Sequence, residues 1–324
     1  MSGDTATNGN ASAAARPPKL SVVLPVYNGA ASIGETLASI AAQSESDFEL
    51  LVIDDGSTDA TPRLLADAAA RDKRIRVITQ PNGGITRALI RGCEEARAPI
   101  IARHDCGDVS KRERFARALE LLARSSRCVV AACEVDYVGP GGEPLYGTSH
   151  ASRDIRAALL HGAGNSIFGL PHHGSAVFRA DAYRRAGGYR AEFYFAQDLD
   201  LWIRMAPLGD ICIDPSVQYV ARIGVQTISS RHRQAQVALT EIAVALRDTD
   251  NDTQRTALLQ QAAAVRPTRT SPRSRDDAKA LYFIAACLHR RGDGRWKGYA
   301  AKALRRNLLH LRAWLLFVRP RRRA

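Results

Sequence analysis

Two short clusters of acidic side chains carry the clearest chemical signal in this sequence. Asp54–Asp55 directly follow the apolar run Phe48–Ile53, while Asp105 and Asp108 come shortly after the apolar run Ile100–Ala102. Parallel α/β sheets bind ligands at the carboxyl ends of their strands, and carboxylate oxygens placed there suit a metal ion or a polyol. Because a carboxylate at a strand end can instead cap the next helix, capping stays open as the alternative for each of them.

Alternating strand and helix signals surround these clusters through the first half of the chain. Apolar runs predict strands, and the amphipathic segments between them predict helices, which is the pattern of a doubly wound α/β sheet. A longer strand is expected at Cys128–Val138, where a turn at Gly139–Gly142 breaks the alternation. The predicted strands before it are Lys19–Val26, Phe48–Ile53, Ile75–Thr79 and Ile100–Arg103, and the predicted helices are Ala31–Gln43, Thr61–Ala70, Ile85–Ala96 and Lys111–Ala123.

The second half of the chain is less regular. Near the C-terminus, Asp276–Leu288 and Lys297–Phe317 are typical of a helical pair, and the Pro- and Arg-rich stretch Arg266–Arg275 is typical of a linker. Between the two halves we expect a helix near Asp154–His161, a short strand at Ser175–Arg179, and the start of a helix within Phe195–Trp202.

Composition and charge divide the 324 residues into three expected parts. Residues 1–17 predict a disordered tail, because they are rich in small polar residues and lack the basic start and apolar run of a signal peptide. Residues 18–265 predict the main domain, and residues 266–324 predict a basic linker and helical module with 17 Lys or Arg against 3 Asp. Since no apolar segment reaches the roughly 18 residues that span a bilayer, a cytoplasmic location is expected.

Two common kinds of site are disfavoured by the sequence. The first predicted strand ends in Pro25–Gly29 without a G-x-G-x-x-G or P-loop pattern, which disfavours a classical dinucleotide oxidoreductase or a nucleoside triphosphatase. The six cysteines are scattered without a CxxC pair, so neither a disulfide framework nor a zinc site is expected.

Five motifs, taken together in their order and spacing, resemble glycosyltransferase family 2, whose members use nucleotide sugars as donors. The resemblance extends over residues 19–230. It implies a GT-A type fold, with a doubly wound, mostly parallel sheet and flanking helices, to which this chain adds a C-terminal helical appendage. The motifs stand here as Ser21–Asn28, Asp54–Asp59, Asn82–Gly84, Arg103–Asp108 and Gln197–Trp202.

The resemblance implies that the first strand end and the double-Asp turn hold the nucleoside of the donor. A carboxylate accepts hydrogen bonds from a base N–H or from ribose hydroxyls, and Tyr27 offers a flat face to the base. Arg87 is placed to reach the diphosphate, although an exposed helical arginine is the open alternative. The residues assigned to the nucleotide sugar are Pro25, Tyr27, Asn28, Asp54, Asp55, Asn82, Arg87 and Asp105.

The family's metal motif, commonly Asp-Ala-Asp-Asp, stands here as Asp105-Cys106-Gly107-Asp108. The resemblance implies that Asp108, with Asp105 nearby, holds Mg²⁺ or Mn²⁺ and so helps to neutralise the departing nucleoside diphosphate. Gly107 departs from the motif and removes one carboxylate. Since these ions take many of their ligands from phosphates and water, two carboxylates could suffice, and a metal-independent enzyme is the alternative.

The resemblance implies that Asp198 is the general base, which takes the proton from the attacking hydroxyl of the acceptor. Relatives often have Glu before this Asp, whereas this chain has Gln197, which we expect to leave Asp198 more readily ionised. Asp200 is expected to face elsewhere on the helix, and Trp202 is expected in the core.

Several further positions keep a structural alternative. Asp59 precedes Thr61-Pro62 and is expected to cap a helix, so it is left out of the site. His172 and His173 lie where the family often has a histidine near the site, but loop histidines without a function fit equally well. His104 beside Asp105 lacks a third ligand at suitable spacing for a transition metal.

At the C-terminus, an apolar run at Trp314–Val318 precedes a cluster of arginines at Arg319–Arg323. This pairing suits peripheral contact with an anionic membrane, on the inner face of the plasma membrane. The alternative is a helix that packs on the main domain and leaves its basic end in water. No aromatic-studded basic stripe predicts nucleic-acid binding.

The combined prediction is an inverting glycosyltransferase that moves a sugar from a nucleotide-diphosphate sugar to an acceptor hydroxyl, with a glycan or a lipid-linked acceptor in cell-surface polysaccharide or glycolipid synthesis. Two alternatives stay open. One is a noncatalytic nucleotide-sugar binding protein, which the departure at Gly107 favours. The other is a basic protein that interacts with membranes or nucleic acids mainly through residues 266–324.

Overall fold

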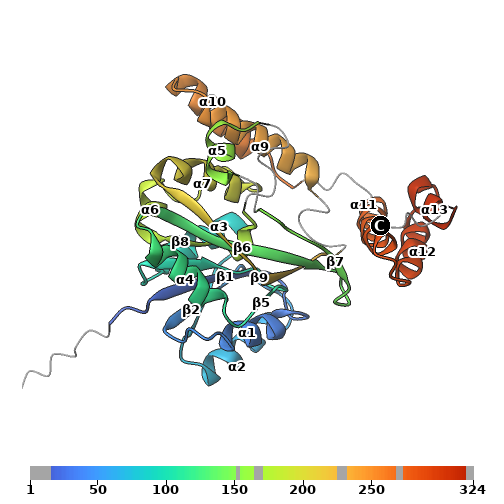
Figure 1. The fold of residues 1–324 in the computed structure, drawn as a ribbon, viewed down its shortest axis with the longest axis horizontal. Coiled ribbons are helices and arrows are strands. Elements are labelled where there is room, and N and C mark those ends of the chain that lie inside the picture. The colour runs from blue at the N-terminus through green and yellow to red at the C-terminus, as the bar shows by residue number, and fades with distance from the viewer. Residues whose placement is uncertain (1–15, 151–153, 164–170, 225–231, 268–272, 319–324) are drawn as a thin grey trace, which may run out of the picture.

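The computed structural model describes residues 16–150, 154–163, 171–224, 232–267 and 273–318. Within them a nine-stranded sheet lies at the centre, helices cover both of its faces, and three further helices follow at the C-terminal end (Figure 1). Of the expected N-terminal tail, only Arg16 and Pro17 fall within the described residues.

One half of the sheet is parallel. Strand β1 (Leu20–Val26) pairs in parallel with both β2 (Phe48–Asp54) and β4 (Ile100–Arg103), and β3 (Ile75–Thr79) extends the sheet beyond β2. The strand order in the described residues is β3-β2-β1-β4-β8-β6-β9-β5, with β7 paired to β6. Because β1, β2 and β4 are parallel neighbours, their carboxyl ends lie at one edge, and this edge carries both acidic clusters.

The other half of the sheet is mixed. Strand β8 (Val177–Arg179) is antiparallel to both β4 and β6 (Cys128–Val138), and β9 (Asp210–Arg222) runs parallel to β6. The short β5 (Val109–Ser110) pairs antiparallel with β9, and β7 (Pro144–Gly147) forms a hairpin with β6. The pairing of β5 with β9 brings residues near 220 beside Asp105 and Asp108.

The sequence patterns do not predict β9, although it is the longest strand among the described residues. Pro215 and Ser216 interrupt its apolar alternation, and proline usually argues against an interior strand. The sheet accommodates them by a register shift: Cys133 pairs with Asp214, whereas Glu134 pairs with Val217. The extra residues therefore form a bulge, and the strand continues past it.

Two helical layers enclose the sheet, as expected for a doubly wound fold. On one face, Leu24 and Val52 of the sheet pack with Phe115, and on the other Leu51 and Phe178 belong to the same buried cluster as Trp202. The first layer holds α1 (Ile33–Ala41), α2 (Thr61–Arg71) and α4 (Arg114–Arg124); the second holds α3 (Ile85–Glu95), α5 (Ile155–His161), α6 (Ala180–Arg185), α7 (Gln197–Met205), α9 (Arg233–Arg247) and α10 (Asp252–Ala264).

Three helices, which we call the C-terminal module, follow the main domain: α11 (Arg273–Arg290), α12 (Trp296–Arg306) and α13 (Leu311–Val318). The prediction of a helical pair is wrong in one respect, because the second predicted helix divides into α12 and α13. Asn307 leaves the helical conformation with φ −151° and ψ 98°, and its Oδ1 accepts a hydrogen bond from the Leu309 N–H. The connecting residues therefore form a turn that reverses the chain.

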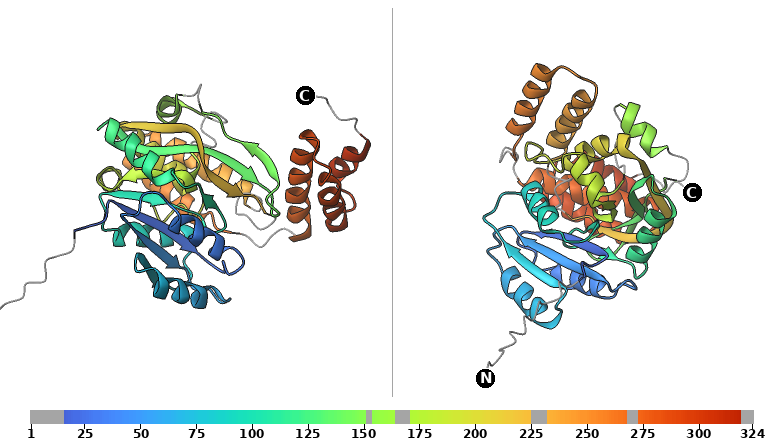
Figure 2. Two further views of the ribbon diagram at one scale, coloured as in Figure 1. Left: turned by 60° about the horizontal axis from the view of Figure 1, so that its bottom comes forward. Right: turned by 90° about the vertical axis from the view of Figure 1, so that its left-hand side faces the viewer.

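The C-terminal module docks on the tip of the β6–β7 hairpin, and the left view of Figure 2 shows it beside the main domain. Leu145 of β7 joins a buried cluster with Ile284 and Leu288 of α11. The Tyr299 hydroxyl donates a 2.7 Å hydrogen bond to Glu143, at the turn of the hairpin. Within the described residues, none of the helices combines the length and apolar character needed to cross a membrane.

Candidate active site

The first acidic turn, after β2, is held closed by its own carboxylates. Asp55 is 3% exposed and accepts hydrogen bonds at Oδ1 from the Gln80 side chain (2.7 Å) and the Gly83 N–H (2.9 Å). Its Oδ2 accepts from the Gly84 N–H at 2.8 Å. Asp54 is 1% exposed, and its Oδ1 accepts from the Ser57 N–H at 3.0 Å. Both carboxylates therefore fix the loops around this edge of the sheet.

The other residues assigned to the donor lie around this turn. Asn28 has a positive φ of 50°, and its Oδ1 accepts from the Thr58 N–H at 2.8 Å, so it ties the end of β1 to the acidic turn. Asn82 donates from Nδ2 to the Asp55 carbonyl at 3.0 Å. Pro25 is buried within β1, Tyr27 is 53% exposed, and Arg87 is exposed on α3.

Asp59 accepts a hydrogen bond from the start of α2, as expected, but it does not occupy the N-cap position. Its Oδ1 accepts from the N–H of Thr61, the first residue of α2, at 2.9 Å, and its Oδ2 accepts from the Ala30 N–H at 3.1 Å. The N-cap position itself is Ala60. Asp59 therefore joins the start of α2 to the β1–α1 loop.

In the second acidic turn, after β4, the buried carboxyl group of Asp108 lies near the negative charge of Asp105. Asp108 is 7% exposed; its Oδ2 accepts from the Tyr219 hydroxyl at 2.9 Å and its Oδ1 from the Arg222 N–H at 2.9 Å. The Tyr219 hydroxyl also accepts from the Asp105 N–H at 3.1 Å, so one side chain holds both acidic residues. Burial, followed by the charge of Asp105, raises the pKa of Asp108 to about 7.

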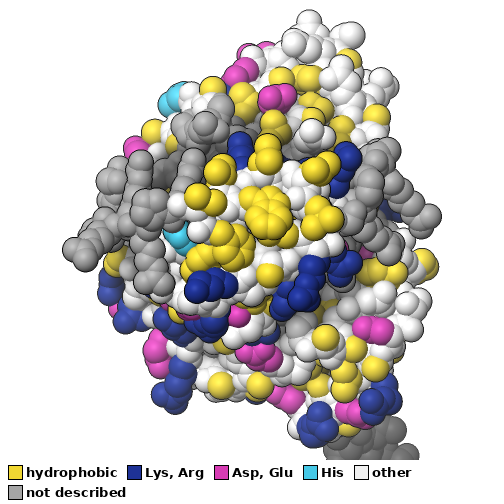
Figure 3. Space-filling view, turned by 90° about the vertical axis from the view of Figure 1, so that its right-hand side faces the viewer, with side chains coloured by type: hydrophobic (Ala, Val, Ile, Leu, Met, Phe, Trp, Pro, Cys, Tyr) yellow, Lys and Arg dark blue, Asp and Glu magenta, His cyan; other side chains and the backbone are white. Residues whose placement is uncertain are grey.

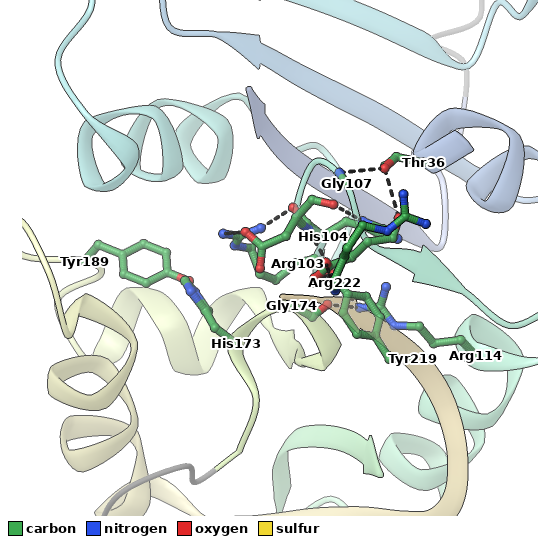
Figure 4. A network of polar contacts seen from close by, with 12 residues as sticks. Thr36, Arg103, His104, Gly107, Arg114, His173, Gly174, Tyr189, Tyr219 and Arg222 are labelled. Atoms are coloured by element: carbon green, nitrogen blue, oxygen red, sulfur yellow. Dashed lines mark hydrogen bonds and ion pairs between the residues drawn. The ribbon is translucent and has the colours of Figure 1, made fainter. Parts of the chain in front are cut away.

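Two buried arginines stand behind this turn (Figure 4). Arg103 is 1% exposed; it donates to the His104 carbonyl and forms an ion pair with Asp105 at 2.5 Å. Arg114 is 2% exposed and donates to the carbonyls of Arg103 and Gly174. The guanidinium of Arg114 also lies 4.8 Å from the centre of the Tyr219 ring. These contacts position Tyr219 and Asp105 from the interior side.

Two glycines explain the shape of this turn. Gly107 has φ +99°, in the left-handed region that favours glycine, and its N–H donates to Thr36 Oγ1 at 2.9 Å. A Cβ at position 107 would have Ser32 Oγ as its nearest neighbour, at 3.5 Å. At Gly174, a Cβ would lie 2.4 Å from the Tyr219 hydroxyl oxygen and 2.9 Å from Asp105 Oδ2. Backbone conformation and close packing therefore account for both glycines.

Asp198 lies in the first turn of α7. This helix begins directly after Ala196, a non-glycine residue with a positive φ of 53°. The Oδ1 of Asp198 accepts from the Leu199 N–H at 2.9 Å. Desolvation by the surrounding protein raises the pKa of Asp198, and the negative charge of Asp105 adds to that rise. The expected ease of ionisation beside Gln197 is therefore outweighed by burial, which favours the neutral carboxyl.

The two neighbours of Asp198 have the structural roles that were expected. Asp200 is 2% exposed and forms ion pairs with Arg190 at 3.0 Å and with Arg204. Trp202 is fully buried in the core. These contacts fix α7, which presents Asp198.

Tyr137 on β6 is influenced by the charges of three carboxylates of this region. Burial raises its pKa, and the negative charges of Asp108, Asp105 and Asp198 add to that rise. His172 packs beside the same residue, with ring centres 5.6 Å apart, and burial lowers its pKa to about 4. The charges of the second acidic turn and of Asp198 on α7 therefore act on the same tyrosine. His173 donates to or accepts from the Tyr189 hydroxyl at 2.8 Å.

Comparison with protein families identifies this arrangement. The family described as "Glycosyl transferase family 2" matches residues 21–185, just over half of the chain. This chain belongs to glycosyltransferase family 2. The match begins in β1 and runs through both acidic turns to the end of α6.

Curated relatives extend this assignment. The putative glycosyltransferase EpsE of Bacillus subtilis is 31% identical over 198 residues, which cover 59% of this chain and 68% of EpsE. The putative teichuronic acid biosynthesis glycosyltransferase TuaG of the same organism is 30% identical over 139 residues, covering 43% of this chain and 55% of TuaG. A 31% identical protein of Sinorhizobium fredii, y4gI, is much longer: the match covers 64% of this chain but only 22% of that protein.

A solved structure supports the fold. The mannosyltransferase PcManGT from Pyrobaculum calidifontis, in complex with GDP-Man and Mn²⁺, is similar with a TM-score of 0.56 at 21% identity, covering 94% of this chain and 84% of that protein. The predicted GT-A type of sheet and the predicted family are thus confirmed. The glycosyltransferase prediction is confirmed at the level of the family.

The second acidic turn of this family 2 chain fits a hard divalent cation, with a limited set of protein ligands. Among the described residues, no group of three or more His, Cys, Asp or Glu side chains is arranged to hold a metal. Asp105 and Asp108 nevertheless lie close enough for the charge of one to raise the pKa of the other. A cation between them would remove that repulsion, and Mg²⁺ or Mn²⁺ takes its other ligands from phosphate and water.

Several residues of this site were not expected from the sequence. Tyr219 and Arg222 lie on β9, more than a hundred residues after the second acidic turn, which they contact. Arg103 and Arg114 resemble ordinary charged residues at the end of a strand or in a helix. The only local signal is the alternation Val217-Gln218-Tyr219-Val220-Ala221, which indicates a strand with Tyr219 on one face.

Proposed function

We propose that this family 2 chain is an inverting glycosyltransferase that moves a sugar from a nucleotide-diphosphate sugar to an acceptor hydroxyl. The observation that supports it best is the pair Asp105 and Asp108, joined by the Tyr219 hydroxyl on one turn, with Asp198 near enough for the charge of Asp105 to act on it. In a single displacement, the acceptor oxygen bonds to the anomeric carbon as the bond from that carbon to the diphosphate breaks. One carboxylate must take the acceptor proton, and positive charge must meet the leaving group.

The base in this proposal is Asp198. Its raised pKa makes its carboxylate a better proton acceptor than an exposed aspartate, because a general base works best when its pKa approaches the working pH. Gln197, which is 7% exposed, adds no charge beside it. Asp200 is unsuited to the role, since Arg190 and Arg204 already neutralise it.

The donor in this proposal lies along the edge formed by β1, β2 and β4. Tyr27 would stack on the base, because its ring is 53% exposed beside the first acidic turn. Asp55 uses three of its roughly four acceptor positions on protein donors, so Oδ2 keeps one for the nucleoside. Pro25, Asn28, Asp54 and Asn82 would shape this pocket, and Arg87 would reach the diphosphate.

Asp105 and Asp108 would hold the divalent cation, whose contribution when bound is to neutralise the leaving diphosphate. The cation would compete with the Tyr219 hydroxyl for Oδ2 of Asp108. Tyr219 and Arg103 then position the two carboxylates, since they hold Asp105 through its N–H and its side chain.

The acceptor in this proposal is a growing glycan or a lipid-linked sugar of the cell surface, reached from the cytoplasmic side. The relative TuaG, named for teichuronic acid biosynthesis, supports an acceptor of this class. Contact of the C-terminal module with a membrane is a separate proposal, because family membership and the nucleotide-sugar site do not depend on it.

Donor binding is tested by measuring the melting temperature with a panel of UDP- and GDP-sugars, with and without Mn²⁺. A ligand that binds only the folded protein raises its melting temperature, and we expect one donor to do so most strongly with the metal present. If every donor leaves the melting temperature unchanged, the nucleotide-sugar site is wrong.

The base is tested by Asp198→Asn in a transfer assay with the donor so identified. We expect the transfer rate to fall by about 10² to 10⁴-fold, while the donor still raises the melting temperature. Asp181→Asn, at an exposed aspartate in the first turn of α6, is the matched control and should keep the wild-type rate. A wild-type rate in Asp198→Asn would refute the assignment, and donor binding without turnover of any acceptor would favour a noncatalytic binding protein.

A further inference from the structure

An exposed apolar surface lies on one side of the C-terminal module. It consists of the turn between α12 and α13 and the outer side of α13. We call it the apolar patch; its members and their exposed fractions are Leu308 71%, Leu309 85%, Leu311 75%, Trp314 50%, Leu315 43%, Phe317 47% and Val318 77%. Large apolar side chains gathered in this way on a soluble surface usually mark a site of interaction.

Most of the apolar patch lies outside the contacts that hold the C-terminal module together; the exception is Phe317, whose ring centre lies 5.0 Å from that of Trp296 on α12. Ala303, Leu304, Ala313 and Leu281 form the buried centre of the three helices. The Trp314 indole packs down on the connecting turn, where its Nε1 donates to the Leu308 carbonyl at 2.9 Å. The patch is therefore a preformed surface on a folded support.

Cationic side chains flank the apolar patch. Arg305, Arg306 and Arg312 are exposed and take part in none of the ion pairs found among the described residues. Figure 3, which faces this side of the molecule, shows hydrophobic side chains gathered in the middle with Lys and Arg side chains near them. In the sequence, Arg319 and Arg321–Arg323 follow directly after α13.

We propose that the apolar patch docks on the surface of an anionic lipid bilayer, with α13 lying in the plane of the interface. The apolar side chains would enter the boundary between headgroups and acyl chains, while the flanking arginines would meet anionic headgroups. A tryptophan at the edge of such a surface suits this depth, where its ring is apolar and its N–H is polar. With 8 residues, α13 lies on the membrane and does not cross it.

Charge argues for a lipid surface over a second copy of this chain. Residues 266–324 carry 17 Lys or Arg and 3 Asp, so a symmetric contact would bring two strongly cationic modules together. Like charges across an interface oppose association, whereas an anionic bilayer attracts them. The proposal is independent of the reaction proposed above, because vesicle binding needs neither donor nor acceptor.

The first test measures sedimentation of the full chain with vesicles of phosphatidylcholine alone and with vesicles that also contain phosphatidylglycerol. We expect binding to the anionic vesicles and little binding to the neutral ones, with loss of binding in high salt. The variant Leu308→Ser/Leu309→Ser/Leu311→Ser should lower the partition coefficient at least about tenfold, since each leucine loses apolar contact with the bilayer. Wild-type binding by this variant, or equal binding of the wild type to both kinds of vesicle, would overturn the proposal.

The second test separates local charge from net charge. Arg305→Glu/Arg306→Glu/Arg312→Glu should lower binding to anionic vesicles at least about tenfold. The matched control makes the same change in net charge at exposed arginines of the main domain and should change binding less than about threefold. It is Arg71→Glu/Arg184→Glu/Arg185→Glu. Equal losses in the two variants would refute a defined docking surface.

The third test uses tryptophan fluorescence, because the three tryptophans differ sharply in exposure. Trp202 is fully buried and Trp296 is 6% exposed, so only Trp314 can enter a bilayer without unfolding. Anionic vesicles should shift the emission to shorter wavelength in the wild type but not in Trp314→Phe. If light scattering instead shows a dimer that the triple leucine variant converts to a monomer, a second copy occupies the patch and the membrane proposal fails.

Discussion

The two acidic turns look alike in the sequence but differ in their electrostatic state. In the first, the Asp55 carboxylate accepts three hydrogen bonds from Gln80, Gly83 and Gly84, and it serves as a clamp between two loops. In the second, Asp108 is nearly as deeply buried but lies beside another carboxylate, which raises its pKa to about 7. Burial of a carboxylate is therefore a poor guide to its role; the balance of donors and like charges around it is more informative.

This difference predicts a much larger loss of stability when Asp55 is replaced than when Asp108 is replaced. A carboxylate that satisfies buried N–H groups stabilises the fold, whereas one that faces a like charge opposes folding when it is ionised. In the function proposed above, a bound cation would supply the positive charge that Asp108 lacks. Measurements of stability as well as of activity can therefore test whether the two acidic turns differ in this way.

The largest expected effect is that of Asp55→Ala on stability. The N–H groups of Gly83 and Gly84 and the Gln80 side chain would lose their acceptor, at a combined cost of about 4 kcal/mol in the free energy of unfolding. Urea denaturation measures this, and Asp67→Ala on the exposed side of α2 should cost less than about 0.5 kcal/mol. An equally small loss of stability in Asp55→Ala would show that the Asp55 carboxylate does not hold the two loops together.

Asp108→Asn should leave the fold intact but impair the reaction. We expect the Mn²⁺-dependent transfer rate to fall about a hundredfold, because the cation loses a charged ligand. The free energy of unfolding at pH above 7 should change by less than about 1 kcal/mol, because Asn removes the repulsion with Asp105 but keeps only one of the two acceptors used by the Tyr219 hydroxyl and the Arg222 N–H. A large loss of stability would instead show that Asp108, like Asp55, mainly stabilises the fold.

The pKa of Asp108 also sets a pH dependence. Its pKa rises from an ordinary 3.8 to about 7 in the folded protein, so its ionisation opposes folding; this cost is absent at low pH and complete above about 7. A cation must displace the proton, so Mn²⁺ affinity should increase about tenfold between pH about 6 and about 8. Calorimetric titration measures it, and Asp108→Asn should abolish most of the increase.

The smallest expected effect concerns Gly107, the departure from the family's metal motif. Gly107→Ala should cost about 1 kcal/mol in the free energy of unfolding, because φ +99° strains a residue with a Cβ. Gly34→Ala, in α1 with open space around it, is the control and should be neutral or stabilising. Gly107→Asp should carry the same strain without tighter Mn²⁺ binding; tighter binding would show that a third carboxylate is missing from this site.

The order of strands and helices in the first half of the chain follows from local sequence patterns. Apolar runs and amphipathic segments predict β1 to β4 and α1 to α4 within a few residues, because each of these elements buries one continuous face. Strand β9 is not predicted in this way, because Pro215 interrupts its apolar pattern. The strand continues past Pro215 through the bulge opposite Cys133.

The sequence predicts which carboxylates belong to the site, but not the hydrogen-bond donors and charges that surround each of them. The difference between Asp55 and Asp108 depends on residues that lie far along the chain, such as Gly84, Tyr219 and Arg222. No short motif records such contacts. The raised pKa of Asp198 likewise reflects the packing around α7 and not the neighbouring Gln197 that the sequence draws attention to.

Tyr219 also bears on how the protein is made. The carboxylates of the second acidic turn emerge early in synthesis, but the hydroxyl that joins Asp105 to Asp108 lies on the last strand of the sheet to be translated. Closing a loop of that length costs chain entropy, which the pairing of β9 with β6 and β5 helps to offset. A nascent chain that ends before β9 therefore carries both aspartates but not their shared partner, and assembly of the site coincides with completion of the sheet.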